Sequence, residues 1–382
     1  MELALLIILV LFIIFGFIFL YMVRVVYRQQ LRSLHYDVYL EYIETDKLGP
    51  YYVSLSNKIN EKFDRIDEHD GPLLLRSDGI LHYLPVKHAH QALANYEAYI
   101  NIGDDSYRDK FLEVTESIVI HGKEGACGSF VYEHSISDYP NQKVPWLHAM
   151  AQGQVIAVLC RAFQESNDSR YLDLAKRAAI PFTLDIKDGG VRSVDPVRGV
   201  FYEEYAYHEE NKQNHTLNGM MSALMGIFDL WKTTQEVEYK KIFDDGIQTI
   251  RNNLMSYAFP FCSSYDLRHD YGEYPLMQPR YNSVHIAHLE ILSALTGDQY
   301  FRVVSEKWSQ TLQSRFNRYC YFAYYIIWKC RDLRNDLSNI GLLKMIWLYR
   351  IRLTKRLFNR NIAEDAKRKI SRTKLIHNKG NR

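Results

Sequence analysis

The sequence predicts a mainly α-helical protein. We expect an α/α toroid, an incomplete barrel of helical hairpins, with short β-hairpin loops lining its cleft and one transmembrane helix before it. Three observations support this prediction. An apolar helix followed by an amphipathic helix recurs about every 65 residues, long polar connections separate these hairpins, and the chain begins with a long uncharged run. Because a single hairpin cannot bury its own apolar face, the repeats must stack.

The composition fits one large domain or two ordinary ones. The chain has 382 residues, of which 47% are hydrophobic, so global disorder is excluded. Its 29 tyrosines suit a sugar-binding cleft and plain helix packing equally well. The five cysteines are odd in number and form no C-x-x-C pair, which argues against a disulfide framework or a zinc site. We expect no metal and no cofactor.

The N-terminal segment is expected to cross a membrane. Residues 3–23 carry no charge and are long enough to span a bilayer core of roughly 30 Å. No basic region precedes them and no small-residue cleavage site follows, so we predict a permanent anchor rather than a signal peptide. Because Arg24, Arg28 and Arg32 follow the run, the positive-inside rule predicts a single-pass protein with its body in the cytoplasm.

Charge divides the chain into an acidic body and a basic tail. Residues 315–382 hold 18 Lys/Arg and 4 Asp/Glu, against 29 and 41 in the rest of the chain. Their apolar and basic residues alternate in clusters, as in helices that lie on an anionic leaflet. Packing of the apolar side on the body is an equally good interpretation. Nucleic acid is not an expected partner, because no recognition module is visible.

The repeats are aligned on one tyrosine in each amphipathic helix. These tyrosines are spaced 64, 68 and 61 residues apart, and they are Tyr107, Tyr171, Tyr239 and Tyr300. The apolar helices before them are "HQALANYEAYINI", "GQVIAVLCRAFQE", "MMSALMGIFDLWK" and "IAHLEILSAL". One connection, "GGVRSVDPVRGVFYEEY", has the turn and β-type residues of a hairpin. The predicted parts are a transmembrane anchor (1–23), a linker (24–79), the α/α-toroid domain (80–312) and a basic amphipathic tail (313–382).

Five segments of the body occur in an order that resembles the C-terminal domain of the D-glucuronyl C5-epimerases. They are "PWLHAMAQGQVIAVLCRAF", "GGV…GVFYEEY", "HTLNGMMSALMGIFDL", "SSYDLRH" and "YNSVHIAHLEIL". The similarity covers about residues 80–310. It implies inversion of C5 in D-glucuronate to give L-iduronate, within a polysaccharide of the heparan sulfate or heparosan type. The implied partner is thus an anionic, uronate-containing polysaccharide, and a homodimer is a possible assembly.

The resemblance also implies which residues perform the reaction. Residues that match the family's catalytic positions are Glu204, Tyr205, Tyr265 and Tyr281, and those that match its substrate-binding positions are Arg268 and His285. Three more residues inside the matched segments are predicted to contact substrate, namely Trp146, Gln152 and Asn218. The chain departs from the family pattern in having Ala206 where proline is usual and Asn282 where histidine is usual. It also has too few residues before the toroid for the β-rich domain of larger members.

The chemistry of C5 inversion requires these residue types. A proton must leave a carbon next to a carboxylate, so a cation is needed to stabilise the dianion-like intermediate. Two proton carriers must flank the sugar ring. Arg268 lies three residues after Tyr265, where a guanidinium would favour the phenolate. Tyr281 and His285 are spaced to lie on one face of a helix.

Two other functions remain open from the residues alone. A polysaccharide lyase would use the same proton abstraction and then expel the C4 oxygen. A non-catalytic, membrane-bound scaffold would bind polysaccharide without changing it. A glycoside hydrolase fits less well, because it needs two carboxylates across a cleft, whereas Glu203 and Glu204 are adjacent.

Overall fold

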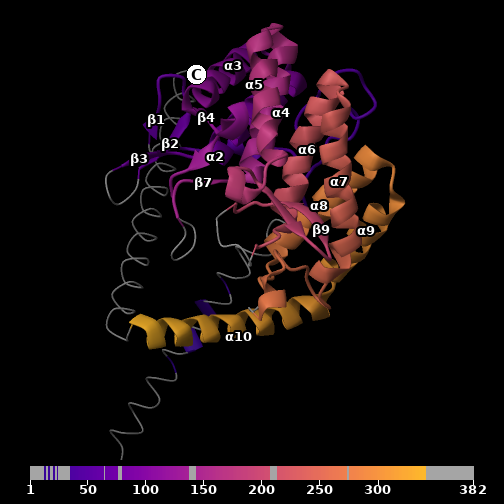
Figure 1. The fold of residues 1–382 in the computed structure, drawn as a ribbon. Helices are drawn as coiled ribbons and strands as arrows, with labels where there is room; N and C mark the ends of the chain where they lie inside the picture. The colour runs from indigo at the N-terminus through magenta and orange to yellow at the C-terminus, as the bar shows by residue number, and fades with distance from the viewer. Residues whose placement is uncertain are drawn as a thin grey trace, which may run out of the picture. The chain divides into compact units, whose positions relative to one another are not determined.

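Four helical hairpins form the body of the protein (Figure 1). The computed structural model describes residues 35–340 apart from 64, 76–79, 137–142, 207–212 and 273–274, together with six single positions before residue 25. The hairpins are α2 (Pro85–Ile102) with α3 (Asp105–His121), α4 (Ala149–Ser166) with α5 (Ser169–Ala179), α6 (Leu217–Thr234) with α7 (Val237–Asn253), and α8 (Pro279–Thr296) with α9 (Gln299–Gln313). The prediction of a mainly helical chain of repeated hairpins is confirmed.

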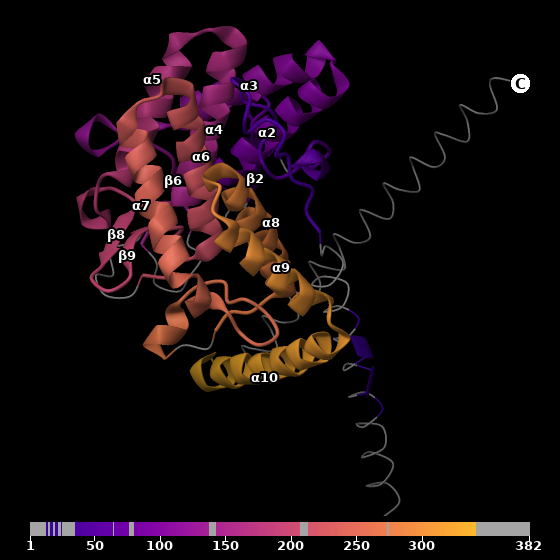
Figure 2. The same ribbon diagram turned by 90° about the vertical axis from the view of Figure 1, so that its right-hand side faces the viewer.

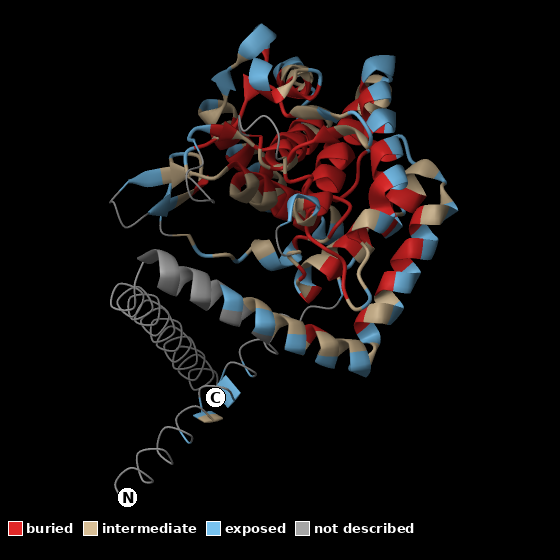
Figure 3. Ribbon diagram, turned by 60° about the horizontal axis from the view of Figure 1, so that its bottom comes forward, coloured by how far each residue is buried: buried red, intermediate tan, exposed pale blue. Residues whose placement is uncertain are grey.

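The first helices of the hairpins make a continuous row. Helix α2 packs on α4, α4 on α6, and α6 on α8 (Figure 2). This row holds much of the core (Figure 3), and in α6 every residue from Leu217 to Leu230 is buried. The second helices bury only part of their surface, as their amphipathic sequences predict. Apolar helices are therefore central, and amphipathic helices border solvent.

The same two-residue link joins the helices of every hairpin. Its first residue takes a left-handed conformation with φ between 56° and 76°, and these residues are Gly103, Asn167, Gln235 and Gly297. Its second residue is acidic, and in three hairpins its side chain accepts a hydrogen bond from the backbone N–H two residues later, as N-capping residues do. The aligned tyrosines fall at the third position of α3, α5 and α7 and at the second position of α9, so the predicted alignment holds in three hairpins and is one residue off in the fourth.

Short antiparallel sheets occupy the connections. The first sheet has β1 (Arg65–Ile66), β2 (Pro72–Leu75) and β3 (Leu81–Tyr83). Three two-stranded sheets follow: β4 (Lys123–Glu124) with β5 (Phe130–Val131), β6 (Glu133–His134) with β7 (Trp146–Leu147), and β8 (Arg192–Asp195) with β9 (Gly199–Tyr202). The last of these is the hairpin that the sequence predicts in this connection.

Part of the segment expected to be a linker lies in the core. Leu48, Tyr51 and Tyr52 are buried, and the Tyr52 hydroxyl donates to Asp229 over 2.7 Å. The same carboxylate pairs with the buried guanidinium of Arg161, also at 2.7 Å. This polar group ties the segment before the first hairpin to α4 and α6.

The two ends of the chain are described only in part. Within the described residues, no helix is long and apolar enough to cross a membrane. The predicted transmembrane run, residues 3–23, lies almost wholly outside the described residues, as does the tail beyond residue 340. The chain divides into two compact units, Met1–Arg318 and Tyr319–Arg382, and helix α10 (Arg315–Ile340) begins in the first and continues into the second.

Candidate active site

The loops that carry the predicted catalytic residues are bound to the N-terminal ends of the central helices. The carbonyl of Glu203 accepts a 3.0 Å hydrogen bond from the first N–H of α4, at Ala149. The carbonyl of Tyr265 accepts a 3.1 Å bond from the first N–H of α6, at Leu217. The first N–H groups of a helix lack partners inside the helix, so these bonds fix both loops at the helix ends.

Glu204 lies at the centre of this site. Its Oε1 atom accepts a 2.8 Å hydrogen bond from the Tyr265 hydroxyl and lies 3.7 Å from His148 Nε2. Its Oε2 atom lies 3.5 Å from Asn218 Nδ2, near the start of α6. Gly219, which follows Asn218, must be small, because a Cβ at this position would overlap Glu204 Oε2. The buried carboxylate is thus contacted by Asn218 of α6, by His148 just before α4 and by Tyr265 of a loop.

Three tyrosines extend from this carboxylate in a row. The hydroxyl groups of Tyr205 and Tyr265 are 3.1 Å apart, and the ring of Tyr281 packs on the ring of Tyr265 with centroids 4.3 Å apart. Tyr265 is buried, whereas Tyr205 and Tyr281 are half-buried. The sequence-based expectation that these residues lie together with Glu204 agrees with this geometry.

Burial keeps the central tyrosine protonated. It raises the pKa of Tyr265 well above its usual value, and the negative charge of Glu204 raises it further. The expectation that the neighbouring guanidinium would favour the phenolate is therefore wrong for Tyr265. Arg268, the first residue of the 3₁₀ helix Arg268–Tyr271, instead pairs its Nε with the buried Asp266 carboxylate at 2.8 Å.

Aromatic rings form a stack on one side of Tyr205. The centroid of the Trp146 ring lies 5.3 Å from that of Tyr205, 5.5 Å from that of His148 and 4.6 Å from that of His134. The indole N–H of Trp146 donates to the Ile136 carbonyl at 2.8 Å. Burial lowers the pKa of His134 to about 4, and burial together with His134 lowers the pKa of His148 well below its usual value. Both imidazoles are therefore neutral at neutral pH.

Sequence reasoning missed His134 and His148. His148 falls inside the segment "PWLHAMAQGQ", where it is the residue before α4, and its position two residues after Trp146 in an extended segment was the available signal. His134 lies on β6, opposite Trp146 on β7. That pairing depends on a connection whose residues 137–142 lie outside the described part of the chain.

Two predicted substrate-binding residues have their side chains engaged within the protein. The amide of Gln152 donates to the carbonyls of Phe130 and Ala178 and accepts from the N–H of Tyr132. The His285 imidazole is fully buried and lies 2.8 Å from Ser263 Oγ. These contacts hold the segments beside the site. Direct contact of either residue with substrate stays a prediction.

Ala206 and Asn282, the two residues that differ from the family pattern, both make hydrogen bonds. The N–H of Ala206 donates to the Leu147 carbonyl at 3.1 Å, a bond that proline could not make. The Asn282 side chain accepts from the N–H and hydroxyl of Ser263, at 3.1 and 2.6 Å. In each case the substituted residue anchors a loop of the site.

Glu203 and Glu204 contact different sets of residues. Glu203 accepts a hydrogen bond from the Ser193 hydroxyl and lies 2.7 Å from His215 Nδ1, whereas Glu204 contacts Tyr265, His148 and Asn218. Ser193 and His215 line a cavity of about 620 Å³. The adjacent carboxylates therefore do not form an acid–base pair across one cleft.

Comparisons with known proteins agree with the resemblance. A family model described as the D-glucuronyl C5-epimerase C-terminus matches residues 123–310. A D-glucuronyl C5-epimerase of Caenorhabditis elegans is 27% identical over 263 residues, which are 65% of this chain and 40% of the relative. An uncharacterized protein of Methanocaldococcus jannaschii is 24% identical over 170 residues, which are 43% of this chain and 52% of the relative.

Among solved structures, a cellobiose 2-epimerase from Bacillus thermoamylovorans superposes with a TM-score of 0.46 and 12% identity, over 64% of each chain. The chain spans only about half, or less, of the length of the curated relatives it matches. The predicted tyrosines and Glu204 all lie inside the matched region. Residues 123–310 therefore belong to the D-glucuronyl C5-epimerase C-terminal family.

Proposed function

We propose that this chain inverts C5 of D-glucuronate residues within an anionic polysaccharide to give L-iduronate, without cleaving the polymer. One observation supports this above the others. Tyr205, Tyr265 and Glu204 form a continuous hydrogen-bonded chain, with links of 3.1 and 2.8 Å. It lies in the region that matches the epimerase family.

This chain of groups can create a base strong enough for the substrate. A proton passes from Tyr205 to Tyr265, and the Tyr265 proton passes to Glu204. The Tyr205 phenolate then removes the proton from C5, and the hydroxyl of Tyr281 donates a proton to the opposite face. A phenol with a reference pKa near 10 is a better base for a weak carbon acid than a carboxylate. Exchange with solvent at the half-buried phenols restores the starting state.

The two proton carriers come from different parts of the fold. Tyr205 follows β9 in the connection between the second and third hairpins, and Tyr281 lies in the first turn of α8. Tyr265 lies between them, bonded to one and packed on the other. A sugar ring in front of Tyr265 would thus meet one phenol on each face, as inversion requires.

The negative charge of the substrate would be balanced from two sources. The guanidinium of Arg268 has five donors, and its pairing with Asp266 through Nε orients the planar group. Helices α4, α6 and α8 begin at the site without a side-chain capping hydrogen bond, as α2 and α7 also do elsewhere in the fold. Partial positive charge at helix N-termini favours bound anions.

Product analysis tests this proposal. The full chain is incubated with glucuronate-containing polymers of the heparosan type, and the products are examined by NMR for sugar identity and chain length. Iduronate in chains of unchanged length supports epimerisation. An unsaturated uronate at new chain ends would make the protein a lyase. If the polymer binds the protein but is not changed, the result would support a non-catalytic scaffold instead.

We also propose the wider setting that the sequence predicts. The row of four hairpins is part of an α/α toroid, residues 1–23 anchor the chain by a single membrane span, and the body lies in the cytoplasm. The uncharged run with arginines only on its C-terminal side motivates the last two statements. A protease-protection assay that finds the body on the other side of the membrane would overturn them.

A further inference from the structure

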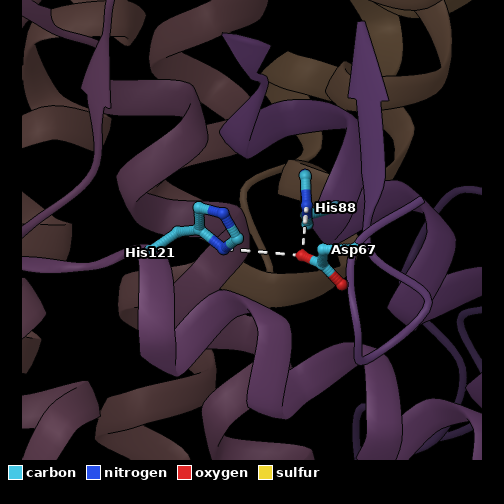
Figure 4. Close-up of side chains that lie close together, drawn as sticks. All are labelled: Asp67, His88 and His121. Atoms are coloured by element: carbon cyan, nitrogen blue, oxygen red, sulfur yellow. Dashed lines mark ion pairs between the residues drawn. The ribbon is translucent and has the colours of Figure 1, made fainter. Parts of the chain in front are cut away.

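A second group of ionisable side chains lies at the first hairpin, apart from the residues described above. Asp67 is in the turn between β1 and β2, His88 is in the first turns of α2, and His121 is the last residue of α3 (Figure 4). His88 Nε2 is 3.9 Å from Asp67 Oδ2, and His121 Nδ1 is 3.6 Å from the same oxygen. One possible ligand atom from each residue lies within 4.8 Å of the others.

His88 has the orientation of a metal ligand. Its Nδ1 lies 3.1 Å from the Leu84 carbonyl, which fixes the proton on Nδ1 and leaves the lone pair on Nε2. The side chain is fully buried, and Nε2 has no hydrogen-bond partner. A buried nitrogen without a hydrogen-bond partner destabilises the folded state. Metal-bound histidines commonly donate their other N–H to a carbonyl in this way.

The carboxylate of Asp67 is also held in place. Its Oδ1 accepts hydrogen bonds from the backbone N–H groups of His69 and Gly71, at 2.9 and 2.8 Å, and its Oδ2 accepts from the Ser117 hydroxyl. The chain comes so close here that a Cβ on Gly71 would stand 2.6 Å from Oδ2 and 2.7 Å from His88 Nε2. Glycine at this position is therefore needed for the cluster to form.

The two distances from Asp67 to the imidazoles are too long for hydrogen bonds and close to the spacing of metal ligands. Hydrogen bonds of this kind measure about 2.7–3.2 Å, less than the 3.6 and 3.9 Å observed. Ligands on a tetrahedral zinc ion, with bonds of about 2.0–2.2 Å, stand about 3.4 Å apart. The ring of Tyr83 covers both imidazoles, with centroids 4.0 and 4.4 Å away.

We propose that Asp67, His88 and His121 bind a divalent transition-metal ion, with Zn²⁺ fitting best and water as the fourth ligand. His121 is the ligand that must adjust, because its Nδ1 also lies 2.8 Å from the Ser117 carbonyl. Its position at the end of α3, with 28% of its side chain exposed, allows the ring to turn. The ion would fasten the β1–β3 sheet to the first hairpin, since the ligands come from both.

The test uses the full chain after treatment with a chelator, titrated with Co²⁺ and with Zn²⁺. Visible absorption of Co²⁺ reports tetrahedral coordination, and competition gives the affinity for Zn²⁺. We expect one ion per chain, a rise in melting temperature on binding, and at least a 100-fold loss of affinity in His88→Gln and in His121→Gln. His82→Gln is the matched control, because this imidazole lies 2.9 Å from Ser135 instead.

The variant His121→Gln keeps the test valid if the buried change His88→Gln prevents folding, which circular dichroism would reveal. No tetrahedral Co²⁺ spectrum in the wild-type chain would overturn the proposal. So would equal Zn²⁺ affinity in wild type, His121→Gln and His82→Gln, since binding would then come from other histidines.

Discussion

Tyr265 donates a 2.8 Å hydrogen bond to the carboxylate of Glu204, 61 residues away in the sequence. Burial of both groups makes this bond the terminal link of the proton chain that begins at Tyr205. In the proposed relay a proton moves along this order, from Tyr205 through Tyr265 to the buried carboxylate of Glu204. Loss of any link should therefore affect the reaction more than the fold.

Phenylalanine at either outer tyrosine should nearly abolish turnover. Tyr205→Phe and Tyr281→Phe each remove one proton carrier and keep the ring that packs on its neighbours. General acid–base groups contribute roughly 10²–10⁴-fold to rate, so we expect losses in that range with little change in melting temperature. Tyr107→Phe, on α3, is the matched control. Near-wild-type turnover in both site variants would contradict the assigned roles.

Glu204→Gln should lower turnover by roughly 10²–10⁴-fold, because an amide cannot take the proton from Tyr265. Glu203→Gln separates this effect from a general loss of charge. The Glu203 carboxylate accepts hydrogen bonds from the Ser193 hydroxyl and from the backbone N–H of His215. Replacing Glu203 should therefore lower the melting temperature while sparing much of the chemical step. Rates measured at saturating substrate, beside thermal unfolding, distinguish the two variants. The opposite pattern would remove Glu204 from the relay.

Arg268→Ala should reduce turnover as severely as loss of a proton carrier, because the charge of the intermediate would lose its cation. Arg268→Lys keeps the charge but loses the planar fork, so it should recover only part of the rate. Comparison of kcat and KM for both variants, with folding checked by circular dichroism, tests this. If Arg268→Ala changed stability alone, the pairing with Asp266 would be its main role.

Acid should destabilise the fold through buried histidines of α8. Burial lowers the pKa of His285 to about 3 and that of His288 to about 4. Unfolded histidines titrate near 6.5, so below that pH the unfolded state binds more protons and the free energy of unfolding falls as pH drops towards 4. Between pH 7 and pH 5, each of these two histidines should lower the free energy of unfolding by about 2 kcal/mol.

Urea unfolding of the full chain at pH 5, 6 and 7 measures this dependence. His288→Gln should remove about 2 kcal/mol of the loss, whereas replacement of the exposed His35 should leave it unchanged. A pH dependence that is the same in wild type and His288→Gln would show that this group does not carry the effect.

The hairpins were predictable because their signals are local. Each link consists of a residue that tolerates positive φ, such as Gly103 or Asn167, followed by an acidic residue. The aligned tyrosines follow two or three residues after the acidic residue. The packed segment at Leu48–Leu55 was not recognised, because its burial depends on contacts with α4 and α6 that are more than 100 residues away.

The site was predictable in its residue types more than in their contacts. Glu204, Tyr205, Tyr265 and Tyr281 come together as the resemblance implies. The partner of Arg268 was not predictable, since sequence gives no means of choosing Asp266 over a substrate. The Asp67, His88 and His121 cluster was also missed, because its members are 21 and 33 residues apart and meet only through the turn at Gly71.

Exchange of the C5 hydrogen tests the central claim most directly. The full chain is incubated in heavy water with a glucuronate-containing polymer, and deuterium at C5 is read by NMR in both uronates. We predict solvent deuterium at C5 of the iduronate formed, and at least a 100-fold slower appearance of that label in Tyr205→Phe and in Glu204→Gln. Iduronate that retains the original C5 hydrogen, or equal exchange in wild type and both variants, would contradict proton transfer through the Tyr205–Tyr265–Glu204 chain.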